Sequence, residues 1–202
     1  MKKIRFSALL LCLSLLCGLL AVPAFADGSL EVNAAHVLLM DAVHDEVLLD
    51  KAADEKTYPA SITKVMTGLL VMDAIQRGEL QLEQVITASD TYRADLSSDG
   101  STQNIRPGEQ LTVHQLLQCM LIASANEAAN ILAETVAGSV PVFVEQMNQR
   151  AKELGCENTH FVNAHGLHDP EHYTTAHDIY RIAKAAMEYD TFREIVSTAD
   201  CY

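Results

Sequence analysis

The chain has 202 residues and is acidic, with 27 aspartates and glutamates against 14 lysines and arginines and a formal net charge of −13. Negative charge of this size argues against nucleic acid or an anionic membrane surface as a partner. None of the five cysteines stands in a Cys-x-x-Cys pair, so the sequence gives no indication of zinc or thiol redox chemistry.

The first 26 residues have the composition of a secretory signal. Three basic residues precede an uncharged, mostly apolar run over 6–22, and Ala24-Phe25-Ala26 supplies a small-residue cleavage site. Cleavage before Asp27 would leave 176 residues of net charge −16, enough for one domain with a hydrophobic core. An uncleaved membrane anchor is the alternative, because the run is near the shortest length that spans a bilayer. The sequence predicts an exported protein on the extracytoplasmic side of the cell envelope.

The mature part, residues 27–202, begins with a predicted β-hairpin, because two short apolar runs flank a polar stretch in "AHVLLMDAVHDEVLLDKAAD", residues 35–54. A helix follows from Ile62 to a stop at Gly78, and its apolar residues recur at spacings of three and four that would bury one face. Residues 88–110 are rich in Ser, Asp and Gly and predict a long loop. Loops of that length in compact domains are often functional.

Four further helices are predicted, and few convincing strands follow residue 50. Thr112 and Gln115 form a capping box before the first of these helices, and Gly138 closes the second. The third opens at Ser139, and Thr175 caps the last one. The side chains expected to face inward from the last helix are Ile179, Ile182, Ala183, Ala186 and Met187.

Ser61 and Lys64 stand three residues apart in "YPASITKVMTG", at the predicted start of the first helix. Positions i and i+3 share a helix face, so these two side chains can meet. A serine hydroxyl becomes a good nucleophile when a neighbouring base takes its proton, and a lysine can be that base when burial lowers its pKa. The alternative is an ordinary helix cap, for which serine is a preferred residue.

Ser124 and Asn126 fall at a break between two helical runs, in "LIASANEAANILAE". A loop at this point can aim a hydroxyl and an amide into a cleft, where Ser124 could relay a proton near Lys64 and Asn126 could bind a substrate amide. A second helix cap is again the alternative, because Ser124 ahead of Glu127 fits a capping box.

Three stretches together resemble the D-alanyl-D-alanine carboxypeptidases, the low-molecular-weight penicillin-binding proteins. They are "PASITKVMTGLL", "SANEAANILAE" and "NTHFVNAHGLHDPEHYTTAHDIYRIAK", and the resemblance runs from about residue 35 to residue 192. It implies an α+β fold like that of the penicillin-binding proteins and serine β-lactamases, with an antiparallel sheet flanked by helices. Residues 27–202 would form part of such a transpeptidase-like domain.

The resemblance also implies a reaction, the removal of the terminal D-alanine from peptidoglycan stem peptides. Ser61 would attack the carbonyl of the penultimate D-alanine, Lys64 would act as general base, Ser124 would relay the proton and Asn126 would position the peptide. The backbone N–H of Ser61 would supply half of an oxyanion hole. The implied partners are a stem peptide ending in D-Ala-D-Ala and β-lactam antibiotics, with no cofactor and no nucleic acid.

The family's third motif, Lys-Thr-Gly or a close variant, does not occur in this sequence. In the family its lysine helps to bind the substrate carboxylate, and its strand supplies the second oxyanion-hole N–H. Losing one such donor costs on the order of 100- to 1000-fold in turnover. We therefore expect a partial sequence that stops before the C-terminal strands and is inactive by itself. Membrane attachment is not visible in this chain.

Two other classes of function stay open: a serine β-lactamase of the same fold, and a non-catalytic relative that only binds wall peptide. A β-lactamase would want an acidic deacylating residue in a loop after Asn126. Five histidines between residues 160 and 177 raise the question of a metal site. Their spacing matches no compact ligand motif, so no metal is predicted. The resemblance implies a structural role for His165 and Gly166.

Overall fold

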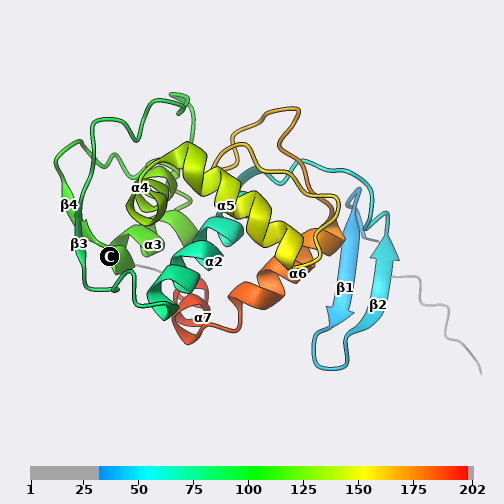
Figure 1. Ribbon diagram of the computed structural model, residues 1–202. Helices are drawn as coiled ribbons and strands as arrows, with labels where there is room; N and C mark the ends of the chain where they lie inside the picture. Colours follow the sequence, from blue (N-terminus) through cyan, green and yellow to red (C-terminus); the bar gives the residue numbers. More distant parts are fainter. Residues whose placement is uncertain (1–31, 200–202) are drawn as a thin grey trace, which may run out of the picture. The chain divides into compact units, whose positions relative to one another are not determined.

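Two antiparallel strands, β1 (Val37–Asp41) and β2 (Glu46–Lys51), form a hairpin near the start of the described residues, which in the computed structural model are 32–199. The predicted hairpin is confirmed, and its register shifts between Leu39 and Met40. Strand β1 packs against helix α6 at the edge of the helical body (Figure 1). The expected secretory signal lies outside the described residues.

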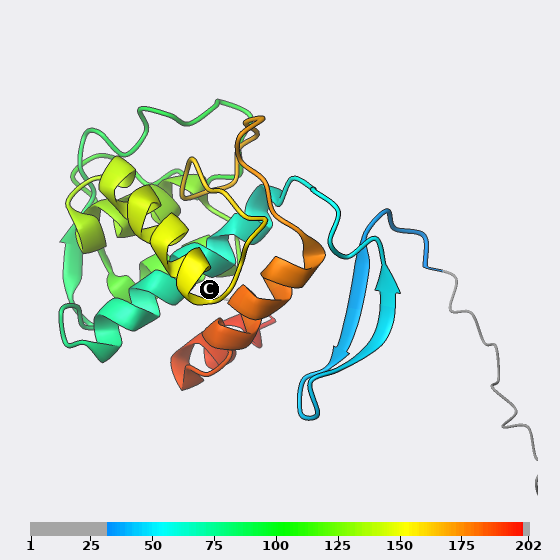
Figure 2. The same cartoon turned by 45° about the vertical axis from the view of Figure 1, so that its right-hand side comes forward.

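Helix α2 (Thr63–Gln76) runs through the middle of the helical body, as two views of the chain show (Figures 1 and 2). It contacts each of the five helices that follow it. These five helices are α3 (Val113–Leu121), α4 (Asn126–Ala137), α5 (Val140–Glu153), α6 (Ala176–Ala186) and α7 (Asp190–Val196). Whatever stands on α2 is therefore fixed from several directions.

The expectation that α2 buries only one face is wrong. Most of its residues are buried, polar Thr67 as well as Leu69 and Val71, because neighbouring helices cover it on several sides. Ile62, expected on the buried face, is instead 52% exposed. It belongs to η1 (Ala60–Ile62), a short 3-10 turn that precedes the helix, and so falls outside the helical spacing.

The predicted helix ends are confirmed at three places. The side chain of Thr112 accepts a hydrogen bond from the backbone of Gln115, whose own side chain bonds back. Gly138 closes α4 with a φ of +78°, and the side chain of Thr175 caps α6. These ends follow from local chemistry, which explains why the sequence predicts them.

The C-terminal part differs from the expectation in two respects. Helix α6 is not the last one, because the chain turns at Tyr189 and forms α7. Met187, expected to face inward, is 44% exposed because it already lies past the end of α6. The side chains that close the core here are Ile182 of α6 and Phe192 of α7.

A second, short antiparallel pair, β3 (Val85–Thr87) with β4 (Gln110–Thr112), was not predicted. Its strands have three residues each and bring together the two ends of the expected loop. The segment 88–109 between them contains no helix or strand, which confirms the loop prediction. The pairing brings the loop back to the start of α3, near the elements that carry the predicted site residues.

The α+β fold class is confirmed, with two separate two-stranded sheets beside a group of helices among the described residues. Within residues 32–199, no helix combines the length and the apolar composition that crossing a bilayer requires.

Candidate active site

Ser61 stands on a turn with an unusual backbone. Ala60, just before it, has a φ of +47°, in the left-handed region that costs a non-glycine residue roughly 1–2 kcal/mol. The turn is closed by a hydrogen bond of 3.1 Å from the backbone N–H of Ile62 to the carbonyl of Pro59. Ser61 is exposed, whereas the next turn is buried. The turn thus presents a hydroxyl at the surface end of a buried helix.

Lys64 lies directly beneath this turn and is only 2% exposed. Its Nζ is 3.2 Å from the Oγ of Ser61 and 3.3 Å from the Oγ of Ser124. It is closer to two further oxygens, 2.7 Å from Oδ1 of Asn126 and 2.8 Å from the carbonyl oxygen of His165. The four predicted site residues are therefore brought together around one amine.

The number of acceptors around this amine exceeds the number of its protons. An ammonium group has three N–H donors, and four oxygens surround Nζ. The neutral amine keeps two donors, which suit the closer oxygens of Asn126 and His165 and leave its lone pair available to accept a proton from a serine hydroxyl. Burial lowers the pKa of Lys64 to about 8, although the charge of Glu127 opposes this shift. A neutral amine is thus accessible close to neutral pH.

The break before α4 positions Ser124. This residue has a φ of +61°, a second strained non-glycine backbone beside Lys64. The alternative interpretation of Ser124 as a helix cap is wrong, because Ala125 is the N-cap of α4 and no side chain caps it. The hydroxyl of Ser124 instead faces Lys64. The backbone N–H of Asn126 is held by the carbonyl of Ser101 at 2.9 Å, which ties the start of α4 to the long loop.

The segment 163–167 supplies the carbonyl below Lys64, and Asn163 shapes it. The Oδ1 of Asn163 accepts the backbone N–H groups of His165 at 3.3 Å and Gly166 at 2.6 Å. Gly166 has a φ of +93°, and a Cβ at this position would lie 1.8 Å from the carbonyl oxygen of Ala60. Only glycine therefore lets this segment pass so close behind the Ser61 turn.

Glu127 anchors the long loop next to the site. It is 1% exposed, and its Oε1 accepts the hydroxyl of Thr102 and the backbone N–H of Gln103, each at 2.7 Å. A cavity of about 330 Å³ lies between this loop and α4, with Gly100, Asn126 and Glu127 in its lining. This cavity borders the group around Lys64 through Asn126.

A larger cavity of about 930 Å³ lies elsewhere, lined by the long loop, α4, α5 and residues 160–162. It touches none of the four predicted site residues. Cavity size alone would therefore have indicated a different place from the one that the polar geometry indicates.

Sequence reasoning missed the residues that support the site from a distance. The hydroxyl of Thr67 donates to the carbonyl of Ala164 at 2.6 Å, and the hydroxyl of Thr63 lies 2.7 Å from Nε2 of His172. His172 is buried, and burial lowers its pKa to about 4. Such partners are about a hundred residues apart in the chain, so no spacing in the sequence signals them.

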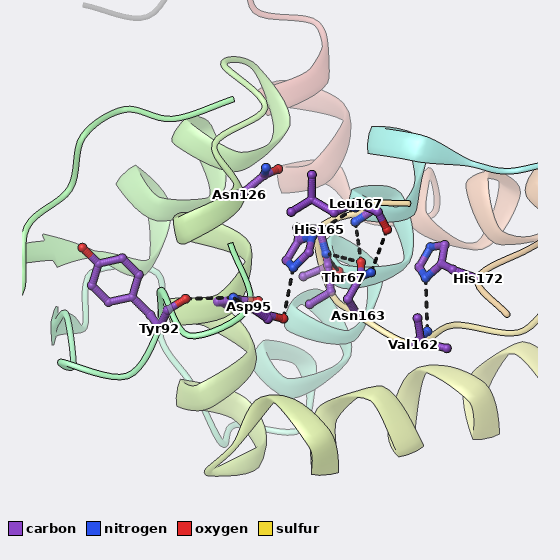
Figure 3. A network of polar contacts seen from close by, with 12 residues as sticks. Thr67, Tyr92, Asp95, Asn126, Val162, Asn163, His165, Leu167 and His172 are labelled. Carbon is purple, nitrogen blue, oxygen red and sulfur yellow. Dashed lines mark hydrogen bonds and ion pairs between the residues drawn. The ribbon is translucent and has the colours of Figure 1, made fainter. Parts of the chain in front are cut away.

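The clustered histidines have separate environments. The ring of His165 bonds within its own segment and to the long loop, whereas that of His172 faces α2. Figure 3 shows these two rings in different parts of the polar network. Over residues 32–199, no group of three or more histidine, cysteine or acidic side chains is arranged to hold a metal ion.

An exposed serine beside a buried lysine whose pKa is lowered by burial is the arrangement of the Ser-x-x-Lys class of serine enzymes. The comparison with family models then identifies the family. Residues 23–200 match the model of the D-alanyl-D-alanine carboxypeptidases, and the chain belongs to this family.

Two relatives at similar identity illustrate the match. The D-alanyl-D-alanine carboxypeptidase DacF of Bacillus subtilis is 36% identical over 188 residues, which are 90% of this chain and 48% of that protein. The crystal structure of the carboxypeptidase DacD from Francisella tularensis has a TM-score of 0.75 and 35% identity, covering 82% of this chain and 39% of that one. The chain thus spans about half of the length of these relatives or less.

A third relative was solved with a ligand. Penicillin-binding protein D2 of Listeria monocytogenes, in its cefotaxime-bound form, has a TM-score of 0.70 and 27% identity, covering 79% of this chain and 64% of that one. The expected resemblance to penicillin-binding proteins is therefore confirmed in sequence and in fold.

Proposed function

We propose that the protein is a serine-type D-Ala-D-Ala carboxypeptidase that removes the terminal D-alanine from peptidoglycan stem peptides. The observation that carries this proposal is the placement of Lys64 Nζ between the hydroxyls of Ser61 and Ser124, at 3.2 Å and 3.3 Å. The family membership of residues 23–200 supports it independently.

In the acylation step, the neutral amine of Lys64 accepts the proton of Ser61, and the Ser61 oxygen attacks the carbonyl carbon of the penultimate D-alanine. The oxyanion that forms faces the backbone N–H of Ser61 and the start of the helix, where the peptide dipoles favour negative charge. The proton on Lys64 then passes through Ser124 to the nitrogen of the leaving D-alanine as the C–N bond breaks. Water afterwards hydrolyses the ester and frees Ser61.

Asn126 orients the peptide in this scheme. Its Oδ1 is occupied by Lys64 at 2.7 Å, which fixes the other end of the amide as a donor. That NH₂ group can bond a carbonyl oxygen of the stem peptide. The cavity beside Gly100 and Glu127 offers room for the part of the peptide before the scissile bond.

The remaining parts of the proposal concern location and partners. Residues 1–26 would direct export, so the protein would act outside the cytoplasm, where its substrate is found. β-Lactams would acylate Ser61, because their strained amide resembles the D-Ala-D-Ala bond. The cefotaxime-bound form of the Listeria relative agrees with this. The expectation that the sequence is partial stays a prediction.

Labelling with a fluorescent penicillin tests the proposal on the full-length protein, meaning residues 1–202 together with a segment that carries the Lys-Thr-Gly motif, since these residues alone are expected to be inactive. We expect a stable covalent label that Ser61→Ala abolishes and that Ser197→Ala, an exposed serine after α7, leaves intact. Release of D-alanine from a synthetic peptide ending in D-Ala-D-Ala should follow the same pattern. Rapid turnover of the drug would instead indicate a β-lactamase, and absence of any label a non-catalytic, peptide-binding relative.

A further inference from the structure

The carbonyl of His165 is one of the two closest acceptors of Lys64, at 2.8 Å, and the ring of the same residue is held at both nitrogens. The backbone N–H of Leu167 donates to Nδ1 at 3.1 Å, so Nδ1 is an acceptor and the ring proton of the neutral form stands on Nε2. This Nε2–H points at Oδ2 of Asp95, 3.1 Å away, as Figure 3 shows. The orientation of His165 therefore depends on a carboxylate from the long loop.

The other oxygen of Asp95 reaches a second element. Its Oδ1 accepts a hydrogen bond of 2.7 Å from Nδ2 of Asn130, which is 1% exposed on α4. Asn130 lies one turn after Asn126, whose Oδ1 is the closest acceptor of Lys64. One carboxylate thus bridges the segment that carries the His165 carbonyl and the helix that carries Asn126.

We propose that Asp95 is a positioning residue that holds the two principal acceptors of Lys64, on segment 163–167 and on α4, at a fixed separation. The proposal rests on the proposed function for its catalytic consequence. Asp95 bonds His165 and Asn130 and makes no hydrogen bond or ion pair with Ser61 or Lys64, so it acts through those two residues.

The charge of Asp95 suits this role. Partial burial raises the pKa of its carboxyl, but the hydrogen bonds from His165 and Asn130 help to outweigh that effect, and the pKa lies below its usual range. The group is therefore ionised at neutral pH. An ionised carboxylate accepts at both oxygens, which the bridge requires.

The long loop itself does not depend on Asp95 for its attachment. The carbonyl of Tyr92 accepts a second bond from Nδ2 of Asn130 at 2.8 Å, and the hydroxyl of Thr91 donates to Oε1 of Glu134 on α4 at 2.8 Å. Glu127 holds the far end of the loop. Loss of Asp95 should therefore loosen the two acceptors of Lys64 without releasing the loop.

The test compares Asp95→Ala and Asp95→Asn with a matched control in the full-length protein. The control is Asp54→Ala, which removes another aspartate–histidine pair, 3.2 Å to His177, that has no link to Lys64. For penicillin acylation we expect Asp95→Ala to lower the acylation rate constant about 10- to 100-fold, as small misplacements of a catalytic group do, with the non-covalent affinity unchanged. The acylation rate constant of Asp95→Asn should lie between those of wild type and Asp95→Ala, because the amide has one oxygen to accept from the two donors of His165 and Asn130.

A second readout does not need enzymatic activity. Acetylation of Lys64 with acetic anhydride, followed by mass spectrometry over a range of pH, reports the midpoint at which the amine becomes neutral. Burial is the main cause of the low pKa of Lys64, near 8, so water admitted by Asp95→Ala should raise this midpoint toward the ordinary value of 10.5. Asp54→Ala should leave it where it is.

The two readouts separate the two proposals. A wild-type protein without penicillin label, but with the Lys64 midpoint raised by Asp95→Ala, would refute the proposed enzyme and retain the positioning of Lys64. An unchanged midpoint together with an unchanged acylation rate in Asp95→Ala would overturn the positioning role. Equal effects of Asp54→Ala and Asp95→Ala would overturn it as well.

Discussion

The β1–β2 hairpin and helix α2 are both rich in aliphatic residues, yet they meet opposite environments. In the hairpin, Leu39 is 48% exposed and Leu48 is 57% exposed, whereas Leu69 of α2 is completely buried. The difference is one of neighbours, because the hairpin packs mainly against α6, whereas five helices pack on α2. An apolar side chain becomes part of a core only where other elements cover it.

Polar groups in the two regions differ in the same way. Lys64 of α2 is buried and finds its partners in segments more than 60 residues away. Lys184 of α6 makes an exposed ion pair of 2.7 Å with Asp45 in the hairpin turn. Chemistry that needs a perturbed amine is therefore expected at the first lysine and not at the second.

The two lysines give the largest expected contrast. Lys64→Met should lower the rate of penicillin acylation about 10³-fold, or about 4 kcal/mol of activation free energy, because general-base catalysis commonly contributes 10² to 10⁴. Lys184→Met should leave this rate unchanged. Stopped-flow measurement with a fluorescent penicillin checks both, and normal acylation in Lys64→Met would contradict the assigned base.

The two leucines test the comparison through stability. Leu69→Ala should lower the free energy of unfolding by about 3 kcal/mol, since it leaves a cavity in a closed core. Leu48→Ala on β2 should cost below about 1 kcal/mol, because exposed substitutions have small effects. Urea denaturation of the full-length protein measures both values. Equal losses would mean that the hairpin face is covered in solution.

Two glycines allow the energetic cost of a close contact to be measured separately from the cost of a left-handed backbone conformation. Gly166→Ala should cost about 2–3 kcal/mol, because its Cβ would overlap the carbonyl of Ala60 and its φ is positive as well. Gly78→Ala meets open space at a similar φ of +74°, so it should cost only about 1 kcal/mol. If both variants show the same decrease in melting temperature, the close packing of Gly166 against Ala60 does not contribute to stability.

His172 should give the smallest effect, seen as a dependence on pH. The unfolded chain protonates this ring near pH 6.5, whereas burial lowers its pKa in the folded protein to about 4. Between these values the unfolded state binds the extra proton, so stability should fall by roughly 2 kcal/mol as pH drops from 6.5 to 4.

The matched variants for this prediction are His172→Gln and His44→Gln, the latter in the exposed hairpin turn. Urea denaturation at several pH values should show a flatter profile for His172→Gln than for wild type or His44→Gln. A slope that is the same in all three proteins would contradict a buried neutral ring.

Much of the secondary structure could be predicted because its signals are local. The capping box at Thr112 and the left-handed C-cap at Gly138 depend on residues within one helical turn, and the structure confirms both. Helix α7 was missed because its seven residues carry too short a pattern, and β3 with β4 because strands of three residues carry almost none. The prediction that α2 buries only one face was wrong, because the sequence of one helix does not show how many other helices pack against it.

The sequence by itself determined the family and the four residues of the candidate site, because the motifs, their spacing and their flanking residues can be read directly along the chain. It left open whether Ser61 and Ser124 cap helices or face a lysine, and the tertiary structure decided this for both, because neither hydroxyl caps a helix and each lies beside Lys64. Only the fold brings Asn126 and the carbonyl of His165 to Lys64, and only burial lowers its pKa. Distance and desolvation arise when distant segments pack, so no local pattern can encode them.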